Sequence, residues 1–91
     1  MRTRIKICGI TRLNDASIAV AHGVDAIGFI QWRNSPRYID PVKAGEIANA
    51  IAPFVTCVAV FVNPSPNEVS EVIEAMPSVT LQFHGEETPE F

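Results

Sequence analysis

The sequence has only two cysteines, no surplus of basic residues and no long hydrophobic run. Cys8 and Cys57 are far apart and form no CxxC or zinc-type motif, so neither a metal site nor a disulfide framework is predicted, and a reducing compartment fits best. A net charge of -3 leaves no extended cationic face for nucleic acid or anionic lipid. The apolar segment 16–30 is interrupted by polar residues and is too short to cross a bilayer. These absences favour small molecules or proteins as partners.

The first residues also lack the apolar core of a signal peptide, because Met1-Arg2-Thr3-Arg4 leads directly into alternating residues. We therefore expect a cytoplasmic protein. What is present is an ordinary globular composition, with 47% hydrophobic and 19% charged residues, far from the low hydrophobicity of disordered chains. Residues 1–91 are expected to fold as one unit, or as part of one, with modest stability unless a partner covers the remaining surface.

Short β-rich runs alternate with amphipathic stretches along the chain, a plan typical of βα repeats. The runs are mostly continuous and β-branched, as strands buried on both faces should be. The expected strands are 4–8, 26–30, 55–62 and 79–83. The stretches between them predict helices that end at His22-Gly23, before Pro53 and at Pro77. Their predicted N-caps are Thr11, Asp40 and Ser65, the last in a capping box with Glu68. Their predicted apolar faces are Leu13, Ala16 and Val20, then Ala44, Ile47, Ala48 and Ile51, then Val69, Val72, Ile73 and Met76.

Alternating strands and helices predict right-handed crossovers and a parallel sheet. Such an α/β fold is either an open flavodoxin-like sheet or half of a (β/α)8 barrel, and the spacing of the elements fits both. The polar residues favour the barrel, because they follow every expected strand and a barrel builds its active site at the carboxyl ends of its strands. These residues are Cys8, then 31–37, then Asn63, then Gln82 and His84.

Five short motifs occur in this chain in the order and spacing of one known enzyme family. They are Lys6-Ile7-Cys8-Gly9-Ile10-Thr11, Gly28-Phe29-Ile30, Ser35-Pro36-Arg37-Tyr38, Val60-Phe61-Val62-Asn63 and Leu81-Gln82-Phe83-His84-Gly85. Through them the chain resembles the amino-terminal half of phosphoribosylanthranilate isomerase. The resemblance implies strands 1–4 of a (β/α)8 TIM barrel with three intervening helices, and a step of tryptophan biosynthesis. The implied reaction is an Amadori rearrangement of N-(5-phosphoribosyl)anthranilate to 1-(2-carboxyphenylamino)-1-deoxyribulose 5-phosphate, without cofactor or metal.

The resemblance makes Cys8 the general base that removes the proton from the sugar C2 once the ring has opened to a Schiff base. The thiolate is the reactive form of a cysteine, and a nearby positive charge favours it. Lys6 is a candidate for that charge, because residues two apart on a strand share a face and lie about 7 Å apart. Taken without the motif, Cys8 is more readily explained as a small buried hydrophobic residue.

The resemblance assigns the anthranilate carboxylate to Arg37, whose planar guanidinium suits a carboxylate. The alternative is a solvated loop arginine. The loop departs from the family pattern, because Gln31-Trp32-Arg33-Asn34 stands where an aromatic-aromatic-Pro-Lys run commonly precedes Ser-Pro-Arg. The shape of the loop, and any role for a lysine in it, are therefore left open.

Gln82 and His84 are expected to line the substrate pocket at the end of the fourth strand, with His84 the more exposed. The alternative is that His84 only caps the strand. Asn63 is a candidate supporting residue, although Asn63-Pro64-Ser65-Pro66 also has the composition of a turn into a capped helix. His22 and Cys57 are expected to be structural.

The general acid of the family, an aspartate after a later strand, and its phosphate-binding loops are not among these 91 residues. We therefore expect the isolated chain to be inactive. We also expect it to associate with itself, or with the missing carboxyl-terminal half, through open sheet edges and an apolar inner face. Two alternatives stay open, a non-catalytic self-associating half-barrel and a flavodoxin-like binding module. The turn 8–11 disfavours the second, because it has no glycine-rich phosphate loop.

Overall fold

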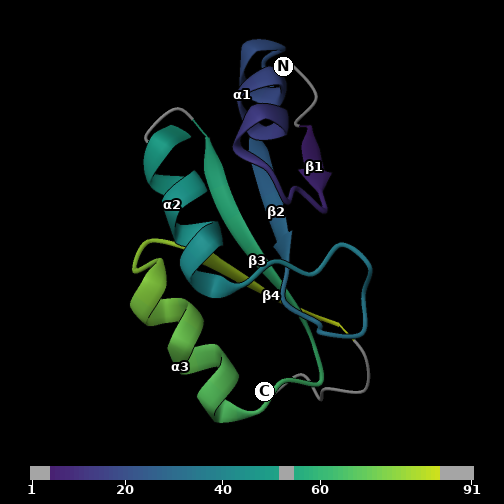
Figure 1. Ribbon diagram of the computed structural model, residues 1–91, viewed down its shortest axis with the longest axis vertical. Coiled ribbons are helices and arrows are strands. Elements are labelled where there is room, and N and C mark those ends of the chain that lie inside the picture. Colours follow the sequence, from purple (N-terminus) through teal and green to yellow (C-terminus); the bar gives the residue numbers. More distant parts are fainter. Residues whose placement is uncertain (1–4, 52–54, 85–91) are drawn as a thin grey trace.

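The computed structural model describes residues 5–51 and 55–84, with the backbone alone for His84. Strands and helices alternate along it, as predicted (Figure 1). The predicted bounds of β2, β3 and β4 are correct to within one residue. The predicted start of the first strand at Arg4 and the predicted end of the second helix before Pro53 lie outside the described residues. The elements are β1 (Lys6–Cys8), α1 (Leu13–Ala21), β2 (Ala26–Ile30), α2 (Pro41–Ile51), β3 (Thr56–Val62), α3 (Pro66–Ala75) and β4 (Thr80–His84).

The sheet is parallel, and each strand pairs with the next one in sequence, in the order β1-β2-β3-β4. Sequential order with right-handed connections puts every connecting helix on the same face of the sheet. Helix α1 packs beside α2 and α2 beside α3, and Figure 1 shows α2 and α3 together on one side of the strands. A flavodoxin-like sheet reverses its strand order at a switch point. The observed order therefore excludes that alternative and fits half of a (β/α)8 barrel.

The face of the sheet beneath the helices forms the core. Successive strand residues point to opposite faces, and the residues that point toward the helices are fully buried: Ile27 and Phe29 of β2, Ala59 and Phe61 of β3. Phe61 also stacks on Phe83 of β4, with ring centroids 5.5 Å apart. The alternate residues, including Cys8, point to the opposite face, which is the interior of the barrel.

The sheet is curved, as half of a barrel should be. Lys6 Nζ in β1 donates a hydrogen bond to Gln82 Oε1 in β4 at 2.5 Å. In a flat sheet the first and fourth strands would lie about 14 Å apart, too far for two side chains standing upright on one face to meet. The register gives a second sign: Lys6 aligns through β2 with Thr56 of β3, whereas Gln82 aligns with Val60, further along that strand. The two contacting side chains are therefore offset along the strand direction. Such an offset is expected where strands are tilted relative to the axis of a barrel.

The second and third helices begin as predicted. Oδ2 of Asp40 accepts the backbone N–H of Lys43 at 3.4 Å, at the start of α2. Ser65 and Glu68 form the capping box of α3: Ser65 Oγ accepts the Glu68 N–H at 3.2 Å, and Glu68 Oε1 accepts the Ser65 N–H at 2.9 Å. The predicted apolar face of α3 is wrong at Ile73, which is 46% exposed. Its neighbour Val72 is buried in the core instead.

The first helix differs from the prediction at its start. Its N-cap is Arg12 instead of Thr11, and no side chain caps it. Leu13, predicted to be buried, is 47% exposed. The helix is rotated so that it buries Ala16 and Ala19, because these small side chains let its backbone approach the sheet more closely than a leucine would.

Candidate active site

Cys8 ends β1 on the interior face of the sheet, and its thiol is only partly buried. Its Cα pairs in register with that of Gly28 in β2. A Cβ atom built on Gly28 would lie 2.8 Å from the Sγ atom of Cys8, well inside normal contact distance. The thiol therefore occupies the space directly over the Gly28 backbone, at the carboxyl end of its strand.

Arg37, in the loop between β2 and α2, lies against Gly9, the residue after Cys8. A Cβ atom on Gly9 would be 2.7 Å from Cδ and 2.8 Å from Nη1 of Arg37. The Gly9 N–H donates to the carbonyl oxygen of Gly28 at 2.9 Å. The backbone N–H of Arg37 donates to Ser35 Oγ at 3.1 Å, which steadies the loop at this point. The structure thus brings the predicted thiol and the predicted guanidinium into one group of adjacent residues.

Lys6 and Gln82 lie on the same interior face, joined by their hydrogen bond of 2.5 Å. The alternation of β1 puts the Lys6 side chain on the face that carries Cys8, as predicted. Gln82 therefore has a definite contact within this chain, since its amide oxygen orients the Lys6 ammonium. Together with Arg37, Lys6 gives the region around the thiol a positive potential that favours an anionic ligand.

The two remaining predicted positions follow β3 and β4. Asn63 comes directly after β3 and is exposed, with a φ of 44°, a left-handed conformation that asparagine adopts more readily than most residues. His84 is the last residue of β4, and its backbone pairs with Val62. The side chain of His84 lies outside the described part of the chain, so its exposure and role stay predictions.

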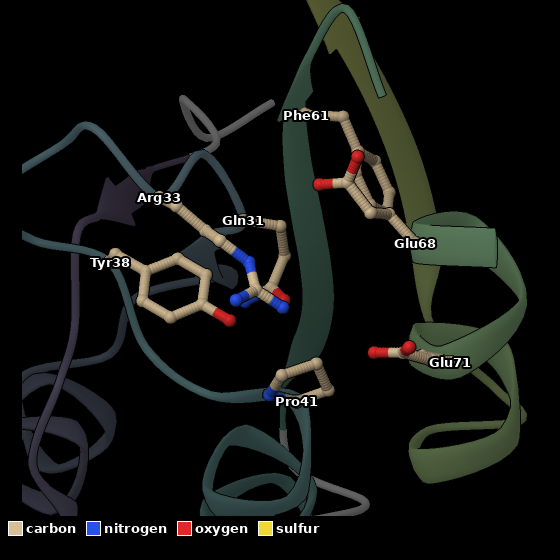
Figure 2. Close-up of a pocket in the computed structure, with 7 residues that line it drawn as sticks. All are labelled: Gln31, Arg33, Tyr38, Pro41, Phe61, Glu68 and Glu71. Atoms are coloured by element: carbon tan, nitrogen blue, oxygen red, sulfur yellow. The ribbon is translucent and has the colours of Figure 1, made fainter. Parts of the chain in front are cut away.

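Other side chains of the β2–α2 loop make contacts outside the group around Cys8. Gln31 is 4% exposed, and its Nε2 donates to the carbonyl oxygen of Ile39 at 2.8 Å. Cζ of Arg33 lies 5.8 Å from the ring centroid of Tyr38. The side chains of Gln31 and Arg33 face α3 across a pocket of about 10 Å³, which has room for about one water molecule. Figure 2 shows the residues that line it, Gln31, Arg33, Tyr38, Pro41, Phe61, Glu68 and Glu71.

Cys57 differs from Cys8 in both face and environment. It lies in β3 on the helix side of the sheet and packs against the core. Burial raises the pKa of the Cys57 thiol, which is the opposite of what a reactive cysteine needs. His22 is exposed at the end of α1, where its backbone N–H donates to the carbonyl oxygen of Ile18 at 3.1 Å. The burial of Cys57 agrees with the structural role predicted for it, and the role of His22 stays a prediction.

The sequence alone did not mark Gly9 and Gly28 as site residues, although the Arg37 side chain lies against Gly9 and the Cys8 thiol lies against Gly28. The available signal was Gly28 itself, because a glycine in the middle of a β-rich run often marks a close approach of another group to the backbone. The close approach of Arg37 to Gly9 had no signal in the sequence, since it depends on how a loop from another strand folds over the turn.

Within residues 5–51 and 55–84, no three His, Cys, Asp or Glu side chains cluster as metal ligands would. The same ranges contain no helix long and apolar enough to cross a membrane. What the described site offers is a thiol, two cationic side chains and an amide, a set suited to proton transfer and to holding an anion.

Sequential parallel strands, helices on one face and polar groups at the carboxyl ends define the first half of a (β/α)8-barrel enzyme. Residues 5–91 match the family model of N-(5'-phosphoribosyl)anthranilate (PRA) isomerase, and the chain belongs to that family. It is 57% identical over its whole length to the N-(5'-phosphoribosyl)anthranilate isomerase of Nitrosomonas eutropha, covering 44% of that protein. The isomerase of Nitrosomonas europaea is 54% identical, again over the whole chain and 43% of the relative.

Solved structures of the family have the same architecture. The isomerase of Thermus thermophilus superposes with a TM-score of 0.88 at 46% identity, over 97% of this chain and 44% of that one. The isomerase of Thermotoga maritima gives a TM-score of 0.90 at 44% identity, over 98% of this chain and 43% of the other. These matches confirm the predicted half-barrel, and the chain spans less than half the length of the relatives it matches.

Proposed function

We propose that this chain supplies the general base and one wall of the substrate site of a phosphoribosylanthranilate isomerase, working with the remaining strands of the barrel. The reaction is the Amadori rearrangement of N-(5-phosphoribosyl)anthranilate, which needs an acid to open the furanose ring and a base to take the proton from C2. The observation that carries the proposal is the line of contacts from Cys8 through Gly28 and Gly9 to Arg37. These contacts bring a thiol and a guanidinium together at the carboxyl ends of the strands.

Cys8 acts as the base in this proposal. Its thiol is partly exposed at the carboxyl end of β1, where barrel enzymes bind their substrates. Lys6 stands two residues earlier on the same face, and Gln82 holds its ammonium on that face. The thiolate is the form that accepts the proton, and the positive charge of Lys6 attracts the anionic substrate to it.

Arg37 binds the anthranilate carboxylate, for which two parallel N–H groups of a guanidinium are well suited. Support comes from a family member that is 44% identical to this chain and was solved in complex with reduced 1-(o-carboxyphenylamino)-1-deoxyribulose 5-phosphate. That compound carries an aromatic carboxylate next to the reacting amine. A ligand of this kind, seated over Cys8, would present its carboxylate toward Arg37.

The acid and the phosphate site come, in this proposal, from the strands that complete the barrel. The outer edges of β1 and β4 carry no further strand among the described residues, and Ile5, just before β1, and Ile7, within it, are 48% and 38% exposed. Apolar surface next to an open edge favours association with another chain, either the complementary half or a second copy. Both cysteines are free thiols, which fits the reducing cytoplasm.

The test combines this chain with the carboxyl-terminal half of the Nitrosomonas eutropha relative, its 57% identical family member, and assays isomerase activity. We expect activity from the pair and none from either piece. In the pair, Cys8→Ala should lower kcat by about 10²- to 10⁴-fold, the usual contribution of a general base. Arg37→Met should mainly raise KM, while Cys57→Ala, the control at the other thiol, should keep activity.

Two results would overturn the proposal. Full activity in Cys8→Ala would show that another group is the base. A pair that folds and associates but never isomerises the substrate would favour the alternative, in which the half-barrel is a non-catalytic association module.

A further inference from the structure

We propose that two glycines are positioning residues of this site: Gly28 seats the thiol of Cys8, and Gly9 seats the side chain of Arg37. The inference deepens the proposed isomerase and rests on it, because it takes Cys8 as the base and Arg37 as the carboxylate ligand. Neither glycine has a side chain to touch a substrate. Each acts by leaving a volume that any other residue would fill.

Gly28 is required for space and not for backbone geometry. It lies in the middle of β2, and the described glycines with positive φ are Gly9 and Gly23. An alanine at position 28 would therefore be unstrained, and it would stabilise the fold slightly by restricting the unfolded chain. Its Cβ, however, would lie 2.8 Å from Sγ and 3.3 Å from Cα of Cys8. What the glycine provides is the volume that the sulfur occupies.

The protein can relieve this clash at the sulfur atom alone. Sγ ends a short side chain, so Cys8 can rotate about χ1 into another staggered position that points away from β2. The contacts to Cα and Cβ of Cys8, at 3.3 and 3.4 Å, need only small shifts. Gly28→Ala is therefore expected to fold with its thiol displaced. Because a misplacement of about 1 Å can cost a reaction about 100-fold, the displaced thiol should be a poor base.

The same residue also fixes the turn that follows Cys8. The carbonyl oxygen of Gly28 accepts the N–H of Gly9 at 2.9 Å and the N–H of Ile10 at 3.3 Å. This turn carries Gly9 beneath the guanidinium of Arg37. Gly28 thus has two effects on the site. Its lack of a side chain leaves room for the thiol of Cys8, and its carbonyl oxygen positions Gly9, on which the guanidinium of Arg37 lies.

Gly9 is required for both geometry and space. Its φ of 88° is a conformation that L side chains rarely adopt, and a Cβ would meet Arg37 Cδ at 2.7 Å. Gly23, after α1, has nearly the same φ of 83°, but a Cβ there meets nothing within 4 Å. Alanine at Gly23 therefore measures the backbone strain alone, and alanine at Gly9 measures the strain together with the displacement of Arg37.

The first experiment examines Gly28→Ala in the active pair of barrel halves. We expect an unchanged or slightly higher Tm, a kcat lowered about 100-fold and a KM changed much less, because the base moves and the carboxylate ligand does not. The effect must act through the sulfur, so adding Gly28→Ala to Cys8→Ala should change the residual activity little. An unchanged kcat in Gly28→Ala, or an equal loss in the Cys8→Ala background, would overturn the role of Gly28. Should Gly28→Ala not fold, restored folding in the double variant would support the thiol as the obstacle, and continued misfolding would refute it.

The second experiment compares Gly9→Ala with Gly23→Ala in the same pair. Both should lower Tm by similar amounts, since both pay for a positive φ. Only Gly9→Ala should raise KM, by at least about tenfold if a charge-assisted hydrogen bond to the substrate is weakened. Equal KM values in the two variants would remove Gly9 from the site.

A measurement on the thiol itself separates this inference from the proposed function. Three-bond couplings across the Cα–Cβ bond of Cys8 report its χ1, with or without catalysis. A changed χ1 in Gly28→Ala, in a pair that lacks isomerase activity, would leave the positioning role standing and sink the proposed reaction. An unchanged χ1 would sink the positioning role whatever the activity.

Discussion

Lys6 and Gln82 join the first and the fourth strand of this sheet directly, through a hydrogen bond of 2.5 Å. The bond holds a positive charge on the interior face, two residues before Cys8 on the same strand. It therefore links the curvature of the sheet to the electrostatic environment of the thiol.

Replacing Lys6 tests that link. Lys6→Met removes the charge and keeps a flexible apolar side chain, so we expect slower alkylation of Cys8 by the anionic reagent iodoacetate at neutral pH, since the positive potential that attracts the anion is lost. Peptide mass mapping distinguishes Cys8 from Cys57. Lys43→Met, on the exposed start of α2, is the control and should leave the rate unchanged. Equal rates in the wild type and Lys6→Met would disprove the influence of Lys6 on the thiol.

The capping box of α3 should contribute measurably to stability. Ser65→Ala removes the acceptor for the Glu68 N–H and should lower the free energy of unfolding by about 1 kcal/mol. Urea denaturation measures the change. Ser70→Ala, at an exposed position inside the same helix, replaces a weaker helix former with a stronger one and should leave stability unchanged or slightly higher. A loss in both variants would mean that the box itself contributes nothing.

Cys57 should make the fold sensitive to alkaline pH. Burial raises the pKa of its thiol in the folded state, so above about pH 8.5 the unfolded thiol loses its proton before the folded one does. The unfolded state then binds fewer protons, and the free energy of unfolding falls as pH rises. Cys57→Ala removes this contribution. Between about pH 7.5 and 9.5 we expect the free energy of unfolding of the wild type to fall relative to that of Cys57→Ala. A constant difference between the two proteins would count against burial of the thiol.

The isolated chain should self-associate and lack isomerase activity. Ile5 and Ile7 are exposed just before β1 and in the middle of it, and β1 is an edge strand that offers unpaired backbone groups. Sedimentation is expected to show species larger than a monomer, and Ile7→Lys should reduce them, because a charge on an edge strand opposes pairing. Asn49→Lys, at an exposed position of α2 away from the sheet edges and the inner face, is the control and should leave association unchanged. A monodisperse monomer, or turnover by the chain alone, would contradict these expectations.

Most of the fold was contained in local patterns of the sequence. The β-branched runs, Asp40 before Pro41 and the pairing of Ser65 with Glu68 depend on a few neighbouring residues, so they predicted α2, α3 and the strands correctly. The start of α1 was not predictable in this way, because the helix begins after Arg12 and no side chain caps it. Packing against the sheet favoured the rotation that buries Ala16 and Ala19.

The sequence by itself also placed Lys6 and Cys8 on one face of the first strand, because alternate strand residues share a face. Only the tertiary structure decided how these groups meet. The curvature that joins Lys6 to Gln82, and the fold of the loop that lays Arg37 on Gly9, arise from contacts between residues far apart in the chain. Such contacts depend on the angle and tilt of neighbouring strands, which no single segment of sequence specifies.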